Sequence, residues 1–247
     1  MSTWELMKTP GVAIVVFIYS HVILQALCYT AGMLHSFTFT NCVITKHRLE
    51  VTPIAQWTPV RLGGWGFSSQ WISVALALAG FSQAIWMLFG FPYLQRKTST
   101  GTVLRICCIA WPIEMALYPL LNELLRANLR PAFWTAAFTT IFLGSGIAMS
   151  FACIQLCLND IAPSPDTLAT LNAVALTINC GMRAIAPVGM ASLYAVGIKG
   201  GWFHGHLGWI VLTFMGLLLN VSVRWLPAKA EGDLHHHAKP SDEEAEG

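Results

Sequence analysis

Six long stretches of this 247-residue chain are almost free of charged side chains, and each is about as long as a membrane helix. A bilayer core about 30 Å thick requires about 20 predominantly apolar residues per helix. Only 11% of the residues are charged, against roughly 25% in soluble domains. The sequence therefore predicts an all-α integral membrane protein with six transmembrane helices, at residues 11–35, 67–91, 102–121, 133–158, 168–196 and 205–225.

The composition also argues against other classes of protein. A formal net charge of +2, with scattered Lys and Arg, gives no basic patch for a nucleic-acid partner. The seven cysteines show no CxxC pair and no metal-ligand spacing, so we predict no metal site and no cofactor. Cys42 lies in a polar loop and stays unassigned, whereas six cysteines fall in apolar runs and are expected to be small packing residues: Cys28, Cys107, Cys108, Cys153, Cys157 and Cys180.

The two ends of the chain are polar. Residues 1–10 contain Glu5 and Lys8 and lead into a run too long for a secretory signal, so this run is expected to remain in the protein. Residues 226–247 are too polar to fold independently and are predicted to form a disordered tail, with solvated His235, His236 and His237. Lys and Arg are distributed almost evenly over the two sides, so charge alone does not orient the helices.

Four residues of the fifth span are the strongest functional candidates. Asn172, Asn179, Arg183 and Pro187 are separated by seven, four and four residues, which places them on one helix face. A cation at the centre of a membrane helix costs about 2.5–3.5 kcal/mol on insertion scales, so Arg183 needs a partner or a watery cavity. The stripe either lines a substrate cavity, with a helix bend at Pro187, or ties the helix to a neighbouring carbonyl or acid.

Other polar residues inside the spans are weaker candidates. Glu114 is the only carboxylate well inside a span and is a candidate proton carrier, or else lies near an interface or pairs with an arginine. Gln155 and Asn159 on the fourth span, and Gln70 and Gln83 on the second, could also line a cavity. Such amides also commonly form hydrogen bonds between helices.

An enzymatic alternative has little support. Intramembrane serine proteases have a reactive serine in a membrane helix, and Ser145 lies between Gly144 and Gly146. The usual glycine two places before the serine is missing, and His204 and His206 fall in a loop rather than in a helix where either could act as the base. We therefore expect that the chain is not an enzyme.

Several short motifs occur together in a familiar order. Two motifs flank the second span: residues 62–69 at its start and residues 91–96 at its end. Further motifs are Asn159 with residues 163–172, and residues 183–187. Together these motifs resemble the C-terminal six-helix half of the major facilitator superfamily. The similarity is greatest to fungal members near the drug:proton antiporter and zinc-induced-facilitator-like branch, and it covers most of the chain from Pro10 to Trp225.

The resemblance implies a fold and an orientation. The six spans would be helices seven to twelve of a twelve-helix carrier, with both termini cytoplasmic. The first, second, fourth and fifth spans would surround the central cavity, which favours Asn179 and Arg183 as cavity residues and disfavours Glu114. The chain departs from the family at Ala186, where members often have glycine, in a longer loop at residues 38–55, and in lacking the first six helices.

The resemblance also implies a function. We expect proton-coupled secondary transport of a small molecule, as in an antiporter, by a truncated or partial carrier in a plasma or vacuolar membrane. Its partners would be the lipid bilayer, the substrate, and a second six-helix half or another copy of the chain, because substrate sits between two such halves. The alternative is a non-transporting membrane protein, either a relic or a modulatory partner of a complete carrier.

Overall fold

The computed structural model describes residues 3–34 and 54–232, which form helices and turns without a β-strand. Cys42, most of the 38–55 loop and the histidine triplet of the tail lie outside these residues. The fold confirms the predicted all-α membrane class. The longer helices are α2 (Val12–Leu34), α5 (Ser69–Ile85), α6 (Phe91–Lys97), α7 (Thr100–Arg126), α8 (Arg130–Ser145), α9 (Met149–Ile161), α10 (Pro165–Gly200) and α11 (Leu207–Val223). The shorter elements are α1 (Thr3–Lys8), α4 (Ile54–Trp57), η1 (Val60–Leu62), η2 (Trp86–Gly90), η3 (Gly146–Ala148), η4 (Trp202–Gly205) and η5 (Ala228–Ala230).

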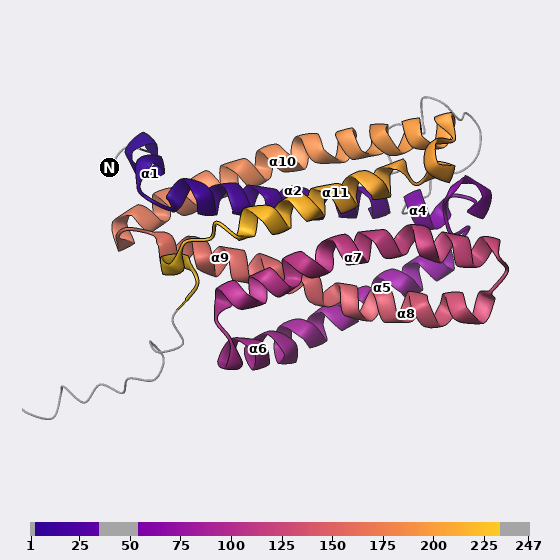
Figure 1. The fold of residues 1–247 in the computed structure, drawn as a ribbon, viewed down its shortest axis with the longest axis horizontal. Helices are drawn as coiled ribbons and strands as arrows, with labels where there is room; N and C mark the ends of the chain where they lie inside the picture. Colours follow the sequence, from indigo (N-terminus) through magenta and orange to yellow (C-terminus); the bar gives the residue numbers. More distant parts are fainter. Residues whose placement is uncertain (1–2, 35–53, 233–247) are drawn as a thin grey trace, which may run out of the picture.

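The long helices lie side by side along one axis and form a single bundle (Figure 1). Within the described residues, five continuous helical stretches are long and apolar enough to cross a bilayer, whereas α11 is apolar but has only 17 residues. Where the sequence predicts six spans, the structure therefore has five of full length and one shorter apolar helix. The five stretches are 12–29, 69–97, 100–126, 130–161 and 165–200.

Two of these stretches are interrupted by a turn of different geometry. The π-helical turn η2 joins α5 to α6, and the 3-10 turn η3 joins α8 to α9. By contrast, α7 continues through Pro112 and Pro119, and α10 continues through Pro187. Neighbouring helices and local adjustments satisfy the backbone groups that such prolines leave free.

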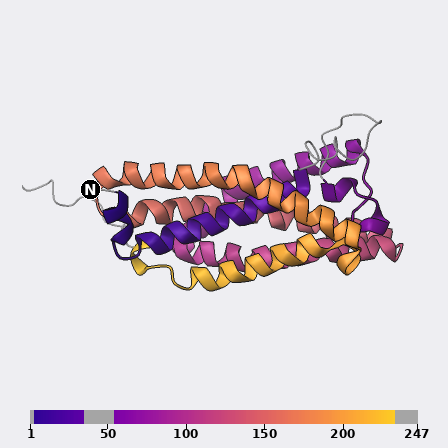
Figure 2. The same ribbon diagram turned by 90° about the horizontal axis from the view of Figure 1, so that it is seen from above.

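Helices α2 and α7 form the centre of the bundle. Helix α2 packs against α9, α10 and α11, and α7 packs against α8, α9 and α11. About half of the apolar part of α2 and of α7 is buried, against 11% for the α5–α6 stretch and 17% for α10. In Figure 2, α2 lies between α10 and α11 at the end of the bundle near the N-terminus, and it crosses α10 further along. Helices α5 and α10 thus expose most of their surface.

The segment that follows α11 folds back onto one end of the bundle. Leu226 and Ala230 are buried, and Glu231 forms an ion pair with Arg105 of α7. The amide of Gly101 donates to the Glu231 main-chain oxygen at 3.0 Å. Lys229 donates to the main-chain oxygen of Ala162 at 3.3 Å, just beyond α9. The polypeptide is therefore anchored as far as residue 231.

Candidate functional site

A polar connection joins α9 to α10 near the turn between them. The amide nitrogen Nε2 of Gln155 lies 2.9 Å from Oδ1 of Asn172 and 3.5 Å from Oδ1 of Asn159. Gln155 and Asn159 lie four residues apart on one face of α9, so a single amide group links two positions on α9 to one on α10. Two of the predicted site residues, Gln155 and Asn172, are thus in direct contact.

A second polar group lies further along α10. Nε of Arg183 donates to Oδ1 of Asn179 at 3.1 Å, as expected for residues four apart on a helix. The hydroxyl group of Tyr19, a buried residue of α2, interacts with the Asn179 side chain and lies within electrostatic range of Arg183. We call Asn172, Asn179 and Arg183, with their partners Gln155, Asn159 and Tyr19, the α10 polar stripe.

The guanidinium group of Arg183 has no charged partner within the described residues. The ion pairs there connect Arg105 with Glu231, and Glu123 with Arg126 and with His206. Arg183 is itself exposed, and it lies in the middle of a 36-residue helix. Since Nε is bound to Asn179, the two terminal nitrogens of the guanidinium group remain available for a ligand.

Pro187 lies one turn beyond Arg183 in the same helix. Proline has no amide hydrogen, so the main-chain oxygen of Arg183 lacks the donor that a helix normally supplies from four residues ahead. Pro187 is half-buried. Pro187 therefore removes one helix hydrogen bond at the level of Arg183, next to the free guanidinium donors.

Glu114 lies at a different helix interface. Its side chain is buried between α7 and α8, where the carboxylate packs directly against the backbone of Gly144. One carboxylate oxygen has no hydrogen-bond partner within the described residues. The carboxylate lies within electrostatic range of Tyr29 and Tyr118, whose hydroxyl groups are 2.7 Å apart. Glu114 is therefore buried and unpaired, and the structure does not bring it to the α10 polar stripe.

Gln83 and Gln70 lie on α5, and both side chains are exposed. Helix α5 packs against α8, and its buried residues are Ile72, Ala75 and Ser82. The side chain of Gln83 makes no hydrogen bond to the residues that the structure describes. The structure thus leaves Gln83 separate from the hydrogen-bonded stripe on α10.

Ser145 and the two histidines do not form a catalytic arrangement. The hydroxyl group of Ser145 lies 2.6 Å from the main-chain oxygen of Ile141 and 3.2 Å from that of Ala79. His204 and His206 lie at the end of the bundle that holds η1 and η4, where Nε2 of His206 is 3.6 Å from a Glu123 oxygen. The serine hydroxyl group therefore connects α8 to α5 through main-chain acceptors.

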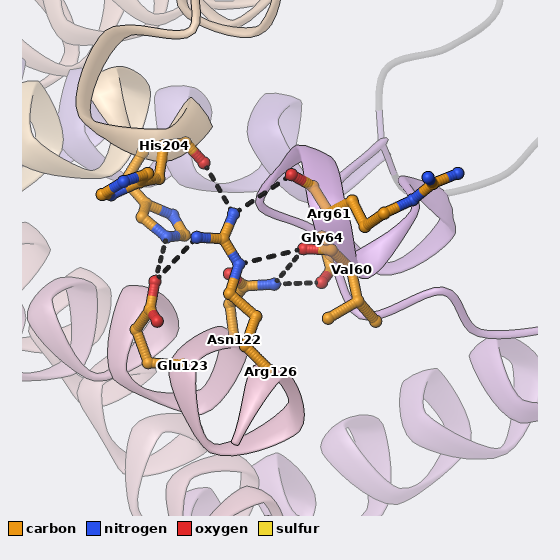
Figure 3. A network of polar contacts seen from close by, with 8 residues as sticks. Val60, Arg61, Gly64, Asn122, Glu123, Arg126 and His204 are labelled. Atoms are coloured by element: carbon orange, nitrogen blue, oxygen red, sulfur yellow. Dashed lines mark hydrogen bonds and ion pairs between the residues drawn. The ribbon is translucent and has the colours of Figure 1, made fainter. Parts of the chain in front are cut away.

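A separate polar network holds the loops together at the η1 and η4 end of the bundle (Figure 3). It is centred on Asn122 and Arg126, near the end of α7. Arg126 donates to the main-chain oxygens of Arg61 and His204, both at 3.2 Å, and Asn122 donates to that of Val60 at 3.0 Å. These three acceptors are main-chain oxygens of η1 and η4, and Arg126 also donates to the Glu123 carboxylate at 3.1 Å, so the network connects these short elements to the end of α7.

Comparison with known proteins gives three informative relatives. The efflux pump azaK of Aspergillus niger is 34% identical over 232 residues, which are 93% of this chain and 46% of the pump. The zinc induced facilitator-like 1 protein of Arabidopsis thaliana is 25% identical over 157 residues, or 62% of this chain and 32% of that protein. The major facilitator-type transporter psiT2 of Psilocybe cyanescens is 25% identical over 170 residues, or 65% of this chain and 32% of the transporter.

The chain spans less than half the length of each of these relatives. The matched part of the relatives is their C-terminal half. No protein-family model matches the chain. No solved structure gives a significant match to it.

Proposed function

The chain is a homologue of transporters of the major facilitator superfamily over almost its whole length, and on this premise we propose that it forms one half of a membrane carrier for a small molecule. The observation that carries the proposal is the α10 polar stripe. An arginine that is exposed in the middle of a long apolar helix is costly in lipid and acceptable beside a watery cavity.

The exposure of the helices supports a second half as partner. Helices α5 and α10 bury little of their apolar surface, although α5 packs against α8 and α10 packs against α2. Apolar α5 surface alone could face lipid, but the α10 face also carries Arg183 and Asn179. We propose that this side meets another six-helix half, with substrate held between the two halves.

The residues divide into two proposed roles. Arg183, Asn179, Asn172 and Gln155 line the substrate cavity, and Gln83 contributes from α5. Glu114, buried among apolar and aromatic side chains, is the proposed proton carrier because a carboxylate in that setting can exchange a proton without an ionic partner.

Transport would be secondary and proton-coupled, and it would run as antiport, in keeping with the efflux pump of Aspergillus niger among the relatives. Both termini would face the cytoplasm. The carrier would be a multi-pass protein of the plasma or vacuolar membrane.

A hybrid protein tests the proposal. In the hybrid, residues 1–232 of this chain replace the C-terminal half of the Aspergillus niger pump. The hybrid is expressed in a strain that lacks the pump, and mass spectrometry of the medium measures export of the compounds that the intact pump releases. We expect the hybrid to restore export and Arg183→Gln to remove it at equal membrane abundance. Arg224→Gln, at the end of α11, is the control that should leave export unchanged.

One result of this experiment would refute the transport proposal, and another would change the role of Arg183. A hybrid that reaches the membrane in normal amount, but leaves export at the level of the strain without the pump, would refute the proposal. Loss of export together with loss of the Arg183→Gln protein from the membrane would assign Arg183 a structural role.

A further inference from the structure

We propose that the segment of α10 around Arg183 binds the anionic group of an organic acid, which defines the substrate class as carboxylates or related oxyanions. This inference rests on the proposed function, because it concerns the same cavity. The site carries an uncompensated positive charge, because Arg183 has no carboxylate partner within the described residues. The buried Glu114 packs against Gly144 of α8 instead.

The hydrogen bond to Asn179 prepares the arginine for such a ligand. Because Nε donates to Oδ1 of Asn179, the guanidinium plane is tethered to its own helix. The Nη1 and Nη2 atoms make no hydrogen bond within the described residues. Two parallel donors on a planar cation match the two oxygens of a carboxylate, which is the geometry of the strongest charge-assisted pairs. Lysine at this position would supply the positive charge without the two parallel donors.

The surroundings favour an acid with an apolar body. Leu176, seven residues before Arg183, lies on the same helix face and is 61% exposed. Cys180, on the same side of the helix, is also exposed. Tyr19 adds a hydroxyl group from α2 next to Asn179. A ligand that contacted all of these groups would place its oxyanion at Arg183 and its apolar part along α10.

Direct binding to the purified full chain in lipid nanodiscs tests the assignment. The three probes share one ring and differ in charge: benzoate, benzamide and benzylamine. We expect saturable benzoate binding by calorimetry, with benzamide at least about tenfold weaker, since a charged hydrogen bond contributes more than a neutral one. Benzylamine should not compete with benzoate.

Variants locate the site. Arg183→Gln should remove benzoate binding, and Arg183→Lys should retain only part of it. Asn179→Asp should also weaken binding, because a carboxylate four residues away would occupy the guanidinium group. Arg224→Gln should bind benzoate as the original chain does. All four proteins should unfold at the same temperature, which separates loss of binding from loss of structure.

Several outcomes would overturn the inference. These are no saturable benzoate binding by the folded chain, equal binding of benzoate and benzamide, and unchanged benzoate binding in Arg183→Gln. Since binding is measured without flux, a chain that binds benzoate while its hybrid fails to export refutes only the transport proposal. A functional hybrid whose chain binds benzylamine in preference to benzoate refutes only the anion assignment.

Discussion

The indole nitrogen of Trp86 donates a hydrogen bond of 2.8 Å to the main-chain oxygen of Phe142 and so connects the interruptions of two helical stretches. In a continuous α-helix that oxygen would accept from the amide of Gly146. The Gly146 amide instead bonds to the oxygens of Leu143 and Gly144, so the Phe142 oxygen does not receive this helix hydrogen bond. The π-helical turn at Trp86 and the 3-10 turn at Gly146 therefore stabilise each other.

Replacing the indole group should show the strength of this connection. Trp86→Phe keeps an aromatic ring and removes the donor, so we expect a loss of about 0.5–1.5 kcal/mol. For a protein of this size, that loss lowers the unfolding temperature by roughly 2–4 °C per kcal/mol. Trp71→Phe is the matched control, because Trp71 is half-exposed and its indole makes no hydrogen bond within the described residues. Equal shifts in both variants would contradict the role of the bond.

A methyl group at Gly146 should conflict with the same ring. A Cβ atom there would lie 3.0–3.3 Å from three atoms of the Trp86 indole group. We expect Gly146→Ala to destabilise the protein when Trp86 is present and to be nearly neutral in a Trp86→Ala background. A double-mutant cycle by thermal unfolding in detergent measures this coupling. Additive effects would show that the close approach has no energetic consequence.

Substitution of Gly144 by alanine should also destabilise the protein, for a different reason. A Cβ atom at this position would overlap the Glu114 carboxylate. Gly144→Ala should therefore destabilise the protein, although alanine ordinarily favours a helix over glycine by about 1 kcal/mol. Gly80→Ala on α5, where nothing lies within 4 Å, should show only that favourable effect. Gly144→Ala with Glu114→Ala should recover most of the unfolding temperature, and failure to recover would refute the proposed contact.

Arg126 should hold the loops at the η1 and η4 end of the bundle. Arg126→Gln removes donors to the main-chain oxygens of Arg61 and His204, and we expect a loss of about 1–3 kcal/mol. Hydrogen exchange should accelerate at residues 58–66 more than elsewhere. The Arg61 side chain points away from the network in Figure 3, so Arg61→Gln should leave exchange unchanged. Uniform acceleration over the whole chain would instead indicate global destabilisation.

The same network predicts a dependence of stability on pH. Burial lowers the pKa of His206 from its ordinary value of 6.5, and the guanidinium group of Arg126 lowers it further, while Glu123 opposes the shift. A histidine with a lowered folded-state pKa binds protons more tightly when unfolded. Its contribution to stability is therefore complete above pH 6.5 and declines as the pH falls below that value. Thermal unfolding from pH 8 to pH 5 should show this decline, and His206→Gln should reduce it.

The fold class was accessible from the sequence, whereas the breaks in the helices were not. Uncharged runs of membrane length predict an all-helical membrane protein, because burial of apolar residues in lipid is a local property of each segment. The turns at Trp86 and Gly146 lie inside such runs and do not alter their apolar pattern. They depend on contacts between two stretches that are distant in the sequence, such as the hydrogen bond from Trp86 to Phe142.

The candidate site shows the same division. The contact of Asn179 with Arg183 follows from a spacing of four residues within one helix, and sequence alone can propose it. The contact of Gln155 with Asn172 requires the packing of α9 on α10. Tyr19 was missed because one tyrosine in an apolar helix has no distinguishing spacing. Nothing in the sequence identified Glu114 as the neighbour of Gly144, because that contact depends on how α7 packs on α8.

The docking of the segment after α11 determines where recombinant versions of the protein can be modified. An affinity tag or fluorescent protein attached directly after Trp225 would displace Leu226 and Ala230 and deprive Arg105 of Glu231. Attachment after Gly232 leaves these contacts in place. Poor expression of a fusion at residue 225 would then reflect the junction and not an intrinsically unstable bundle.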